Sequence, residues 1–316
     1  MSQAWPSTRY LRCHSPTWKS LTSCVFGAHQ GQTLHVGIGT TSGALTAFPV
    51  WGEHVGARGY NVDAKAAVVG EQPGPAVSTL TTTNPGVRPL LMLEGQILEG
   101  GWQNRVVGRS VLVPAQGSMD LDVLCVEEGR WSGGDGHRWG GQRASLRVRG
   151  ALRTGQDQQG EVWRRVGEYE TRYGANASAS YTEHANRAVV DVDRLVSGFR
   201  PLPGQVGVVV GIAGQPVLAE VFDDPRTLAS QFDSIIRAAA LDAVGQREEA
   251  TPSRRARRFV ERLSRVERRA VAPAGVGTTL AGADAYADVT ALTWRRRDVH
   301  LVATNPRHAL NLVGSH

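Results

Sequence analysis

A segment in the second half of the chain, residues 205–225, is QVGVVVGIAGQPVLAEVFDDP. It contains two runs rich in valine and other strand-forming residues, Gln205–Ile212 and Pro216–Phe222. The short connection between them, Ala213–Gln215, carries a glycine at its centre, as β-hairpin turns commonly do. Because a connection this short can join only antiparallel neighbours, the segment predicts an antiparallel β-hairpin.

A helix is predicted directly after this hairpin. Asp224 is a suitable N-cap, Pro225 a suitable first helical residue, and the apolar spacing continues to Ala243. The expected buried face repeats at three- and four-residue steps, at Leu228, Phe232, Ile235, Ile236 and Ala239. Asp223 and Asp224 together could also bind a metal ion, but the capping role accounts for Asp224 more simply.

Short strands separated by glycine and proline dominate the first half of the chain. The candidates are Thr33–Gly39, Ala44–Trp51, Val77–Thr83, Arg88–Leu93, Arg105–Val113 and Met119–Val126. Later segments alternate, with helices at Glu161–Tyr173 and Glu183–Val196 and strands at Val276–Leu280, Tyr286–Thr293 and Asp298–Ala303. We therefore predict an α+β protein with a β-rich N-terminal half, an antiparallel or sandwich-like sheet, and a mixed C-terminal half.

The expected organisation is an N-terminal extension (1–30), a β-rich lobe (31–150) and an α+β lobe (151–316), the two lobes forming either separate units or one continuous domain. With 316 residues and 41% hydrophobic content the chain is long and apolar enough for a real core. The longest apolar run is interrupted by glycine and proline, and the N-terminus lacks a secretory h-region. We expect a cytoplasmic protein that is not inserted in a membrane.

The cysteines are too few for a disulfide framework, and the nine histidines are scattered. Cys13, Cys24 and Cys125 are expected to be reduced thiols in a cytoplasm. No C-x-x-C or H-E-x-x-H motif occurs, so we assign no metal ligands. The sequence also identifies no cofactor.

The whole formal charge of +6 is accounted for by one predicted helix, residues 252–270, because the rest of the chain is neutral overall. Thr251 is its expected N-cap and Pro252 its first residue, and its apolar stripe leaves a face of arginines between Arg254 and Arg269. These arginines either dock a phosphate-rich or protein partner, or form a solvated face. Phe259 belongs to the apolar stripe and no aromatic residue lies on the arginine face, which argues against base stacking and nucleic acid.

The first polar cluster is Gln103-Asn104-Arg105, which follows a glycine-rich bend. Two amides and a guanidinium side by side can recognise phosphate, carboxylate, ribose or a base edge. They can equally close a turn and pair with a carboxylate. From the residues alone, both interpretations stay open.

The second cluster is Cys125-Val-Glu-Glu-Gly-Arg-Trp131. Alternation along the preceding strand places Leu121, Val123 and Cys125 on one face, so Cys125 is expected to be a core residue. Glu127 and Glu128 can act as general acid or base, or grip an arginine as scaffold. Trp131 can stack on a base, but filling the core is its more usual role.

These residues also carry a family resemblance. Gly101-Trp-Gln-Asn-Arg105, Ser110-Val-Leu-Val-Pro114 and Cys125–Trp131 resemble the signature of the bacterial ADP-ribosylglycohydrolase- and rhodanese-phosphatase-associated protein domain family. The resemblance extends from near Thr33 to near Val302, with softer matches at Gln159–Trp163 and in the hairpin. This chain departs from the family pattern at Trp102, where the family often has lysine, and at Gly108, where asparagine is common. The missing lysine weakens any mechanism that would use it.

The resemblance implies an α+β protein encoded near enzymes of NAD and ADP-ribose metabolism. We accordingly expect the protein to bind a nucleotide-like or ADP-ribose-like ligand. Whether it also processes this ligand as an enzyme stays open. The expected ligand-binding residues are Gln103, Asn104, Arg105, Arg130 and Trp131, with Glu127 and Glu128 as acid or base.

This hypothesis predicts that Arg105→Ala abolishes ligand binding without unfolding the protein. The alternative is a non-enzymatic interaction module that docks a partner through the arginine-rich helix 252–270.

Overall fold

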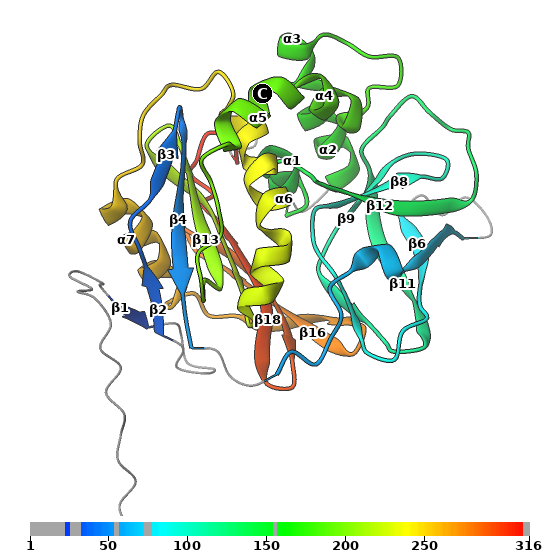
Figure 1. Ribbon diagram of the computed structural model, residues 1–316. Helices are drawn as coiled ribbons and strands as arrows, with labels where there is room; N and C mark the ends of the chain where they lie inside the picture. The colour runs from blue at the N-terminus through cyan, green and yellow to red at the C-terminus, as the bar shows by residue number, and fades with distance from the viewer. Residues whose placement is uncertain (1–22, 26–32, 54–56, 73–77, 154–156, 312–316) are drawn as a thin grey trace, which may run out of the picture.

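The computed structural model describes residues 23–25, 33–53, 57–72, 78–153 and 157–311. Apart from residues 23–25, the predicted N-terminal extension lies outside the described residues, as do Cys13 and Val77, the first residue of one predicted strand. The structure combines a large antiparallel sheet, a closed barrel and seven helices within these ranges, which confirms the α+β class (Figure 1).

The large sheet is built from strands at both ends of the sequence. Its order is β1-β2-β4-β13-β14-β18-β17-β16-β15, with β3 paired to β4. The predicted hairpin forms its centre, because β13 pairs with β14 and also with β4. The strands are β1 (Ser23–Val25), β2 (Thr33–Val36), β3 (Thr40–Ser42), β4 (Leu45–Trp51), β13 (Gly207–Ile212), β14 (Gln215–Phe222), β15 (Arg269–Ala274), β16 (Gly277–Ala283), β17 (Asp288–Trp294) and β18 (Arg297–Thr304).

A closed barrel, in the order β11-β6-β5-β12-β8-β9, lies beside this sheet (Figure 1). Its strands are β5 (Val68–Glu71), β6 (Thr79–Asn84), β8 (Gln96–Gly100), β9 (Arg105–Val107), β11 (Gly117–Cys125) and β12 (Gly136–Arg143). A two-stranded ladder and a short 3-10 turn complete this region: β7 (Leu90–Met92), β10 (Val111–Val113) and η1 (Ala64–Ala66).

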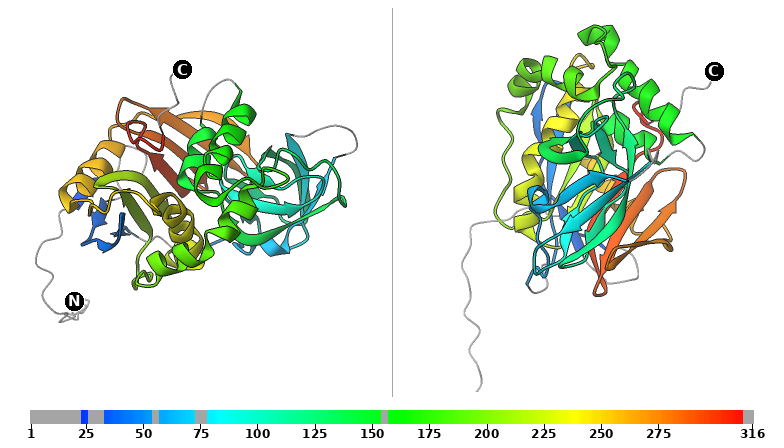
Figure 2. Two further views of the ribbon diagram at one scale, coloured as in Figure 1. Left: turned by 90° about the horizontal axis from the view of Figure 1, so that it is seen from above. Right: turned by 90° about the vertical axis from the view of Figure 1, so that its right-hand side faces the viewer.

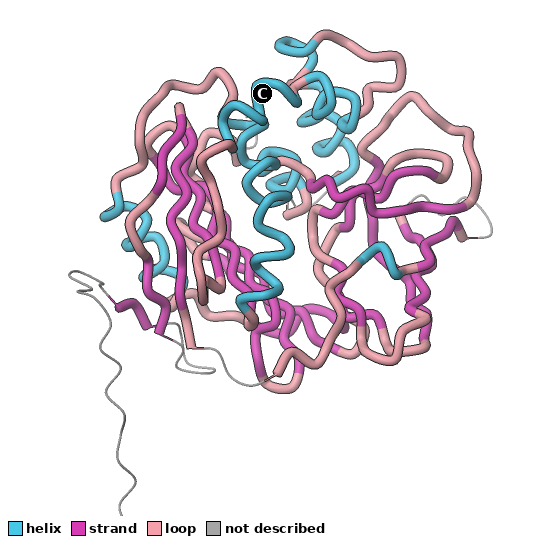
Figure 3. Tube along the Cα trace, viewed as in Figure 1, coloured by secondary structure: helices cyan, strands magenta, loops and turns pink. Residues whose placement is uncertain are grey.

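Helices cover both faces of the large sheet and fill the space beside the barrel (Figures 2 and 3). Helix α6 packs on one face together with α5, whereas α7 packs on the other against β14, β1 and β2. The helices are α1 (Leu146–Ala151), α2 (Gln158–Gly167), α3 (Glu170–Tyr173), α4 (Tyr181–Arg187), α5 (Val189–Val196), α6 (Pro225–Ala243) and α7 (Ser253–Leu263).

Helix α6 follows its sequence prediction closely. Asp224 is the N-cap, and its carboxylate accepts a hydrogen bond from the backbone N–H of Arg226 at 2.8 Å. The predicted apolar residues are buried in the main core. Two further predicted helices are each divided: Glu161–Tyr173 into α2 and α3, and Glu183–Val196 into α4 and α5.

The start and the end of the arginine-rich helix were predicted incorrectly. Helix α7 begins at Ser253 with Pro252 as its N-cap, and no side chain caps it. Thr251 is buried, and its backbone N–H donates instead to the Thr46 hydroxyl at 3.1 Å. The helix ends at Leu263 because the chain then enters β15, whose Arg269 lies opposite Ala281 of β16.

The predicted strand Arg105–Val113 is also divided, because its two halves pair with different partners. β9 joins β8 and β11 in the barrel, whereas β10 joins β7. The alternation predicted in β11 is confirmed: Leu121, Val123 and Cys125 are buried and Asp122 is exposed.

Candidate functional site

The two signature segments, residues 101–105 and 125–131, meet at one end of the barrel. β9 pairs with β11 in antiparallel register, and Arg105 lies directly opposite Cys125. The backbone N–H of Val126 donates to the carbonyl of Asn104 at 3.0 Å. The strands of the two segments are therefore neighbours in the barrel.

Glu127 connects these segments through its carboxylate. It accepts hydrogen bonds from the backbone N–H of Asn104 (3.1 Å), from Arg130 Nε (3.0 Å) and from the Ser178 hydroxyl (2.8 Å). Burial alone would raise the pKa of Glu127, but these hydrogen bonds outweigh burial and hold the pKa below its ordinary value. We call Asn104, Glu127, Arg130 and Ser178 the clasp.

Arg130 uses all of its donors within the clasp and its surroundings. Besides Glu127 and the Asn104 side chain, its guanidinium donates to the backbone carbonyls of Gly100, Gly101 and Ser132 at 2.8–3.2 Å. A guanidinium has five N–H groups. A phosphate bound by Arg130 would therefore have to displace hydrogen bonds that hold the segments together.

Arg105 and Gln103 lie inside the protein. Arg105 is 1% exposed and Gln103 is fully buried. Arg105 Nη1 donates to Gln103 Oε1 at 2.7 Å and contacts Cys125 Sγ at 2.8 Å, while Nη2 lies 3.7 Å from Glu71 Oε1. Cys125 is a core residue as predicted, and burial raises the pKa of its thiol.

Glu128 is exposed. Trp131 is 57% exposed, so the interpretation that it fills the core was wrong. A shallow depression of about 580 Å³ lies beside the clasp. It is lined by Glu99, Gly100, Asn104, Arg130, Gly136, His137 and Arg138. The structure thus brings the predicted residues together but divides them between buried, clasped and exposed positions, and their role in ligand binding stays a prediction.

The clasp also fixes the beginning of α4. The amide of Asn104 donates to the Thr182 hydroxyl at 3.1 Å, and the backbone N–H of Tyr181 donates to the carbonyl of Val126 at 2.9 Å. The Tyr181 hydroxyl then donates to the carbonyl of Arg143 in β12 at 3.0 Å. The signature segments therefore position α4 against β12.

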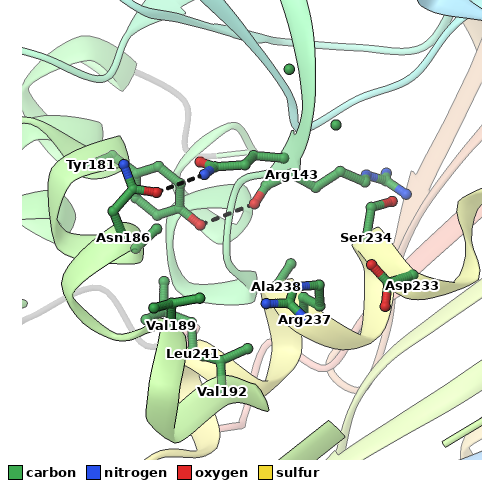
Figure 4. A pocket seen from close by; sticks show the side chains of 14 residues that line it. Arg143, Tyr181, Asn186, Val189, Val192, Asp233, Ser234, Arg237, Ala238 and Leu241 are labelled. Carbon is green, nitrogen blue, oxygen red and sulfur yellow. Dashed lines mark hydrogen bonds between the residues drawn. The ribbon is translucent and has the colours of Figure 1, made fainter. Parts of the chain in front are cut away.

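A cavity of about 340 Å³, which we call the helical pocket, lies between β12, α4, α5 and α6. Figure 4 shows Tyr181 and Asn186 on one side, Asp233 and Ser234 on the other, and Val189, Val192 and Leu241 below them. The remaining lining residues are Gly140, Gly141, Gln142, Arg143, Ala185, Arg237 and Ala238.

The polar wall of the helical pocket has unused hydrogen-bonding capacity. Gln142 donates to Asn186 Oδ1 at 3.1 Å, but its own buried Oε1 has no partner. Arg143 Nε is also buried without a partner. At the rim, Arg237 pairs with the exposed Asp193 at 2.6 Å. The pocket thus has the exposed Asn186 amide on its wall, a cation at the rim and an apolar floor.

Arg143 connects the helical pocket to a buried ionic network. Its guanidinium donates to Glu220 Oε1 at 2.6 Å, and Arg149 donates to Glu220 Oε2 at 2.9 Å. Burial alone would raise the pKa of Glu220, but the two arginines outweigh burial and hold it well below its ordinary value. His300 completes the network, with Nε2 2.9 Å from Glu220 and Nδ1 2.8 Å from the Ser110 hydroxyl.

Sequence reasoning missed both the helical pocket and this network. Glu220 lies in a run of apolar residues in β14, and its position inside a strand buried on both faces is the signal that could have identified it. The pocket has no comparable local signal, because its walls come from segments up to about 100 residues apart, as the span from Gly140 to Leu241 shows.

Among the described residues, no helix is long and apolar enough to cross a membrane. No curated protein and no solved structure matches the chain. A family model matches residues 33–304, which is most of the sequence and includes both signature segments. The chain therefore belongs to the ARG and Rhodanese-Phosphatase-superfamily-associated Protein domain family.

Proposed function

We propose that this protein binds a nucleotide-like or ADP-ribose-like ligand in the helical pocket, and that it does so in the cytoplasm. The observation that carries the proposal is the combination of a polar and an apolar wall around a volume of about 340 Å³. Small-molecule sites typically have about 300–1,000 Å³ and a few polar groups on an apolar lining. Membership of a family named for its association with ARG supports the ligand class.

The lining residues suggest how such a ligand is held. A base or similar ring packs on the apolar floor formed by Val189, Val192 and Leu241. The exposed amide of Asn186 forms a hydrogen bond with an exocyclic amine or ribose hydroxyl. Arg237 at the rim exchanges its contact with Asp193 for a ligand phosphate, because a guanidinium fork matches phosphate oxygens.

The clasp serves this pocket indirectly in the proposal. By fixing Thr182 and Tyr181, it sets the position of α4 and therefore of Asn186 at the pocket wall. The family signature is then a scaffold for the binding site. Turnover by Glu127 would require the ligand to displace the hydrogen bonds that this carboxylate accepts, so binding without turnover is the simpler proposal.

The test is a thermal-shift screen with ADP-ribose, NAD and nucleotides, followed by calorimetric titration of the ligand that stabilises most. A ligand at 100 times its Kd should add about 2.7 kcal/mol to the free energy of unfolding. Asn186→Ala and Arg237→Gln should each weaken binding about tenfold or more. Arg194→Gln is the matched control, because Arg194 is an exposed arginine on neighbouring α5 that does not line the pocket.

Two further variants distinguish the helical pocket from the depression beside the clasp. Trp131→Ala and Arg138→Gln change exposed side chains near the clasp and leave its hydrogen bonds intact. Loss of binding in these variants, with full binding in Asn186→Ala, would place the ligand at the signature segments. No stabilisation by any of the ligands would contradict the proposed function.

A further inference from the structure

Helix α7 exposes a line of arginines on the side that faces away from the sheet. Arg254, Arg258 and Arg262 are four residues apart, which places them on one helix face at steps of about 6 Å. Arg265 follows just beyond the last residue of the helix. Arg254, Arg258 and Arg265 are exposed, and within the described part of the chain no ion pair involves any of these three.

The fold places an aromatic residue from a distant part of the sequence, Tyr286, beside this line of arginines. The ring of Tyr286, in the turn between β16 and β17, lies between two guanidinium groups, with Arg262 4.0 Å and Arg307 4.2 Å from its centroid. The Asp284 carboxylate holds the turn by accepting the backbone N–H groups of Tyr286 and Ala287 at 2.7 and 2.8 Å. The β16–β17 turn and the C-terminal segment thus add Arg307 to the helix face.

This sandwich orders two long side chains before any partner binds. An arginine normally loses considerable rotamer freedom when it forms a fixed contact. Stacking on Tyr286 removes part of that freedom in advance from Arg262 and Arg307, which lowers the cost of binding. Because two guanidinium groups already stack on Tyr286, the ring positions the cations and is not a free stacking surface for a base.

We propose that Arg254, Arg258, Arg262, Arg265 and Arg307 form a binding surface for the phosphate backbone of a nucleic acid. Evenly spaced guanidinium groups suit a polymer with evenly spaced negative charges, and arginine forks match phosphate oxygens. The missing base-stacking platform, which argued against nucleic acid at the level of sequence, is not needed for contacts to the phosphate backbone. A protein interface would need a charge-depleted centre with apolar or aromatic anchors. The outer face of α7 has no such centre, since its apolar residues Ala256, Phe259, Val260 and Leu263 are buried against the sheet.

The test measures the affinity of the full chain for a fluorescent 20-nucleotide single strand by anisotropy at 50 and 200 mM salt. Five phosphate contacts, one for each arginine, predict about a 130-fold loss of affinity over this range on single-stranded nucleic acid. The triple variant R254Q/R258Q/R265Q should weaken binding at 50 mM salt at least tenfold and make the salt slope shallower by about 2.

The matched control is R194Q/R200Q/R247Q, which removes the same charge from exposed arginines elsewhere. It should bind like the unchanged protein, and circular dichroism checks that both variants fold. Tyr286→Ala, which keeps every charge, should weaken binding severalfold. Equal affinity of the two triple variants, or tighter binding of a poly-glutamate peptide than of the oligonucleotide, would overturn the proposal.

Discussion

The Glu127 carboxylate accepts a hydrogen bond from the backbone N–H of Asn104, with Oε2 and N 3.1 Å apart. This contact joins the two signature segments across strands that are more than twenty residues apart in sequence. The same carboxylate is 5% exposed and accepts hydrogen bonds from Arg130 and Ser178. Glu127 therefore has the environment of a structural anion, whereas its neighbour Glu128 lies on the surface.

Replacing each of these two glutamates by glutamine distinguishes the structural role of Glu127 from the surface position of Glu128. Glu127→Gln should lower the free energy of unfolding by about 2 kcal/mol. The neutral amide accepts weaker hydrogen bonds than the carboxylate, and its NH2 group would face the N–H and O–H donors that now bind the carboxylate. Glu128→Gln is the matched control and should change stability by less than about 0.5 kcal/mol. Denaturant unfolding measures both. A stable Glu127→Gln protein would show that the clasp contributes little.

Arg105→Ala tests the buried arginine of the first signature segment. The sequence alone predicted loss of ligand binding in a folded protein, but the buried position predicts loss of stability first. Removing the guanidinium leaves Glu71 with less compensation for its burial, and breaking a buried ion pair costs about 3–5 kcal/mol. Arg109→Ala, which breaks the half-exposed pair with Asp122, should cost less than about 1 kcal/mol. Equal unfolding midpoints for the two variants would contradict this prediction.

Gly101→Ala tests the close packing of the first signature segment. Gly101 has φ +53°, and a Cβ there would lie 2.0 Å from His137 Nε2 and 2.7 Å from Glu71 Oε1. Strain and overpacking together should lower the free energy of unfolding by about 3 kcal/mol. Gly134→Ala is the control, because a Cβ at Gly134 has nothing within 4 Å. Chemical unfolding of the pair should show a change confined to Gly101→Ala.

Much of the fold could be predicted because local signals and tertiary pairing agree. The hairpin of β13 and β14 and helix α6 carry valine runs, a glycine turn and an Asp-Pro start, and the structure uses each of them. β12 was missed because its glycines indicate a loop. The segment nevertheless forms a strand, because it pairs with β5 and β8.

The candidate site was predictable only in part, for a related reason. Strand alternation placed Cys125 in the core, and the family resemblance named both Asn104 and Glu127, which the structure shows in contact. Burial of Arg105 depends on Glu71, a residue from another barrel strand, and no local pattern links the two. Thr251 is a residue type that commonly caps helices, but its backbone N–H donates to the hydroxyl of Thr46, which is 205 positions away in the sequence.

His308 predicts how stability changes with pH. The backbone N–H of Leu310 donates to its Nδ1 at 3.2 Å, and its Nε2 lies 3.2 Å from the carbonyl of Ile212, so the neutral ring satisfies both contacts. Burial lowers the pKa of His308, and the hydrogen bond to the carbonyl opposes this shift only in part. Below the unfolded value of about 6.5, the unfolded chain therefore binds more protons than the folded protein, and stability falls as the pH falls.

The measurement is the free energy of unfolding at pH 7.5 and at pH 5.5. The unchanged protein should lose stability between these values, by up to about 1.4 kcal/mol for each buried histidine whose pKa is lowered, because only the one pH unit below 6.5 contributes in this range. His308→Gln should reduce this difference, since one titrating group is gone, although its hydrogen bonds are also weakened at both pH values. Leu310→Ala is the control, because it destabilises the same segment without removing a titrating group and should keep the full difference. An unchanged difference in His308→Gln would show that His308 is protonated in the folded protein as readily as in the unfolded chain.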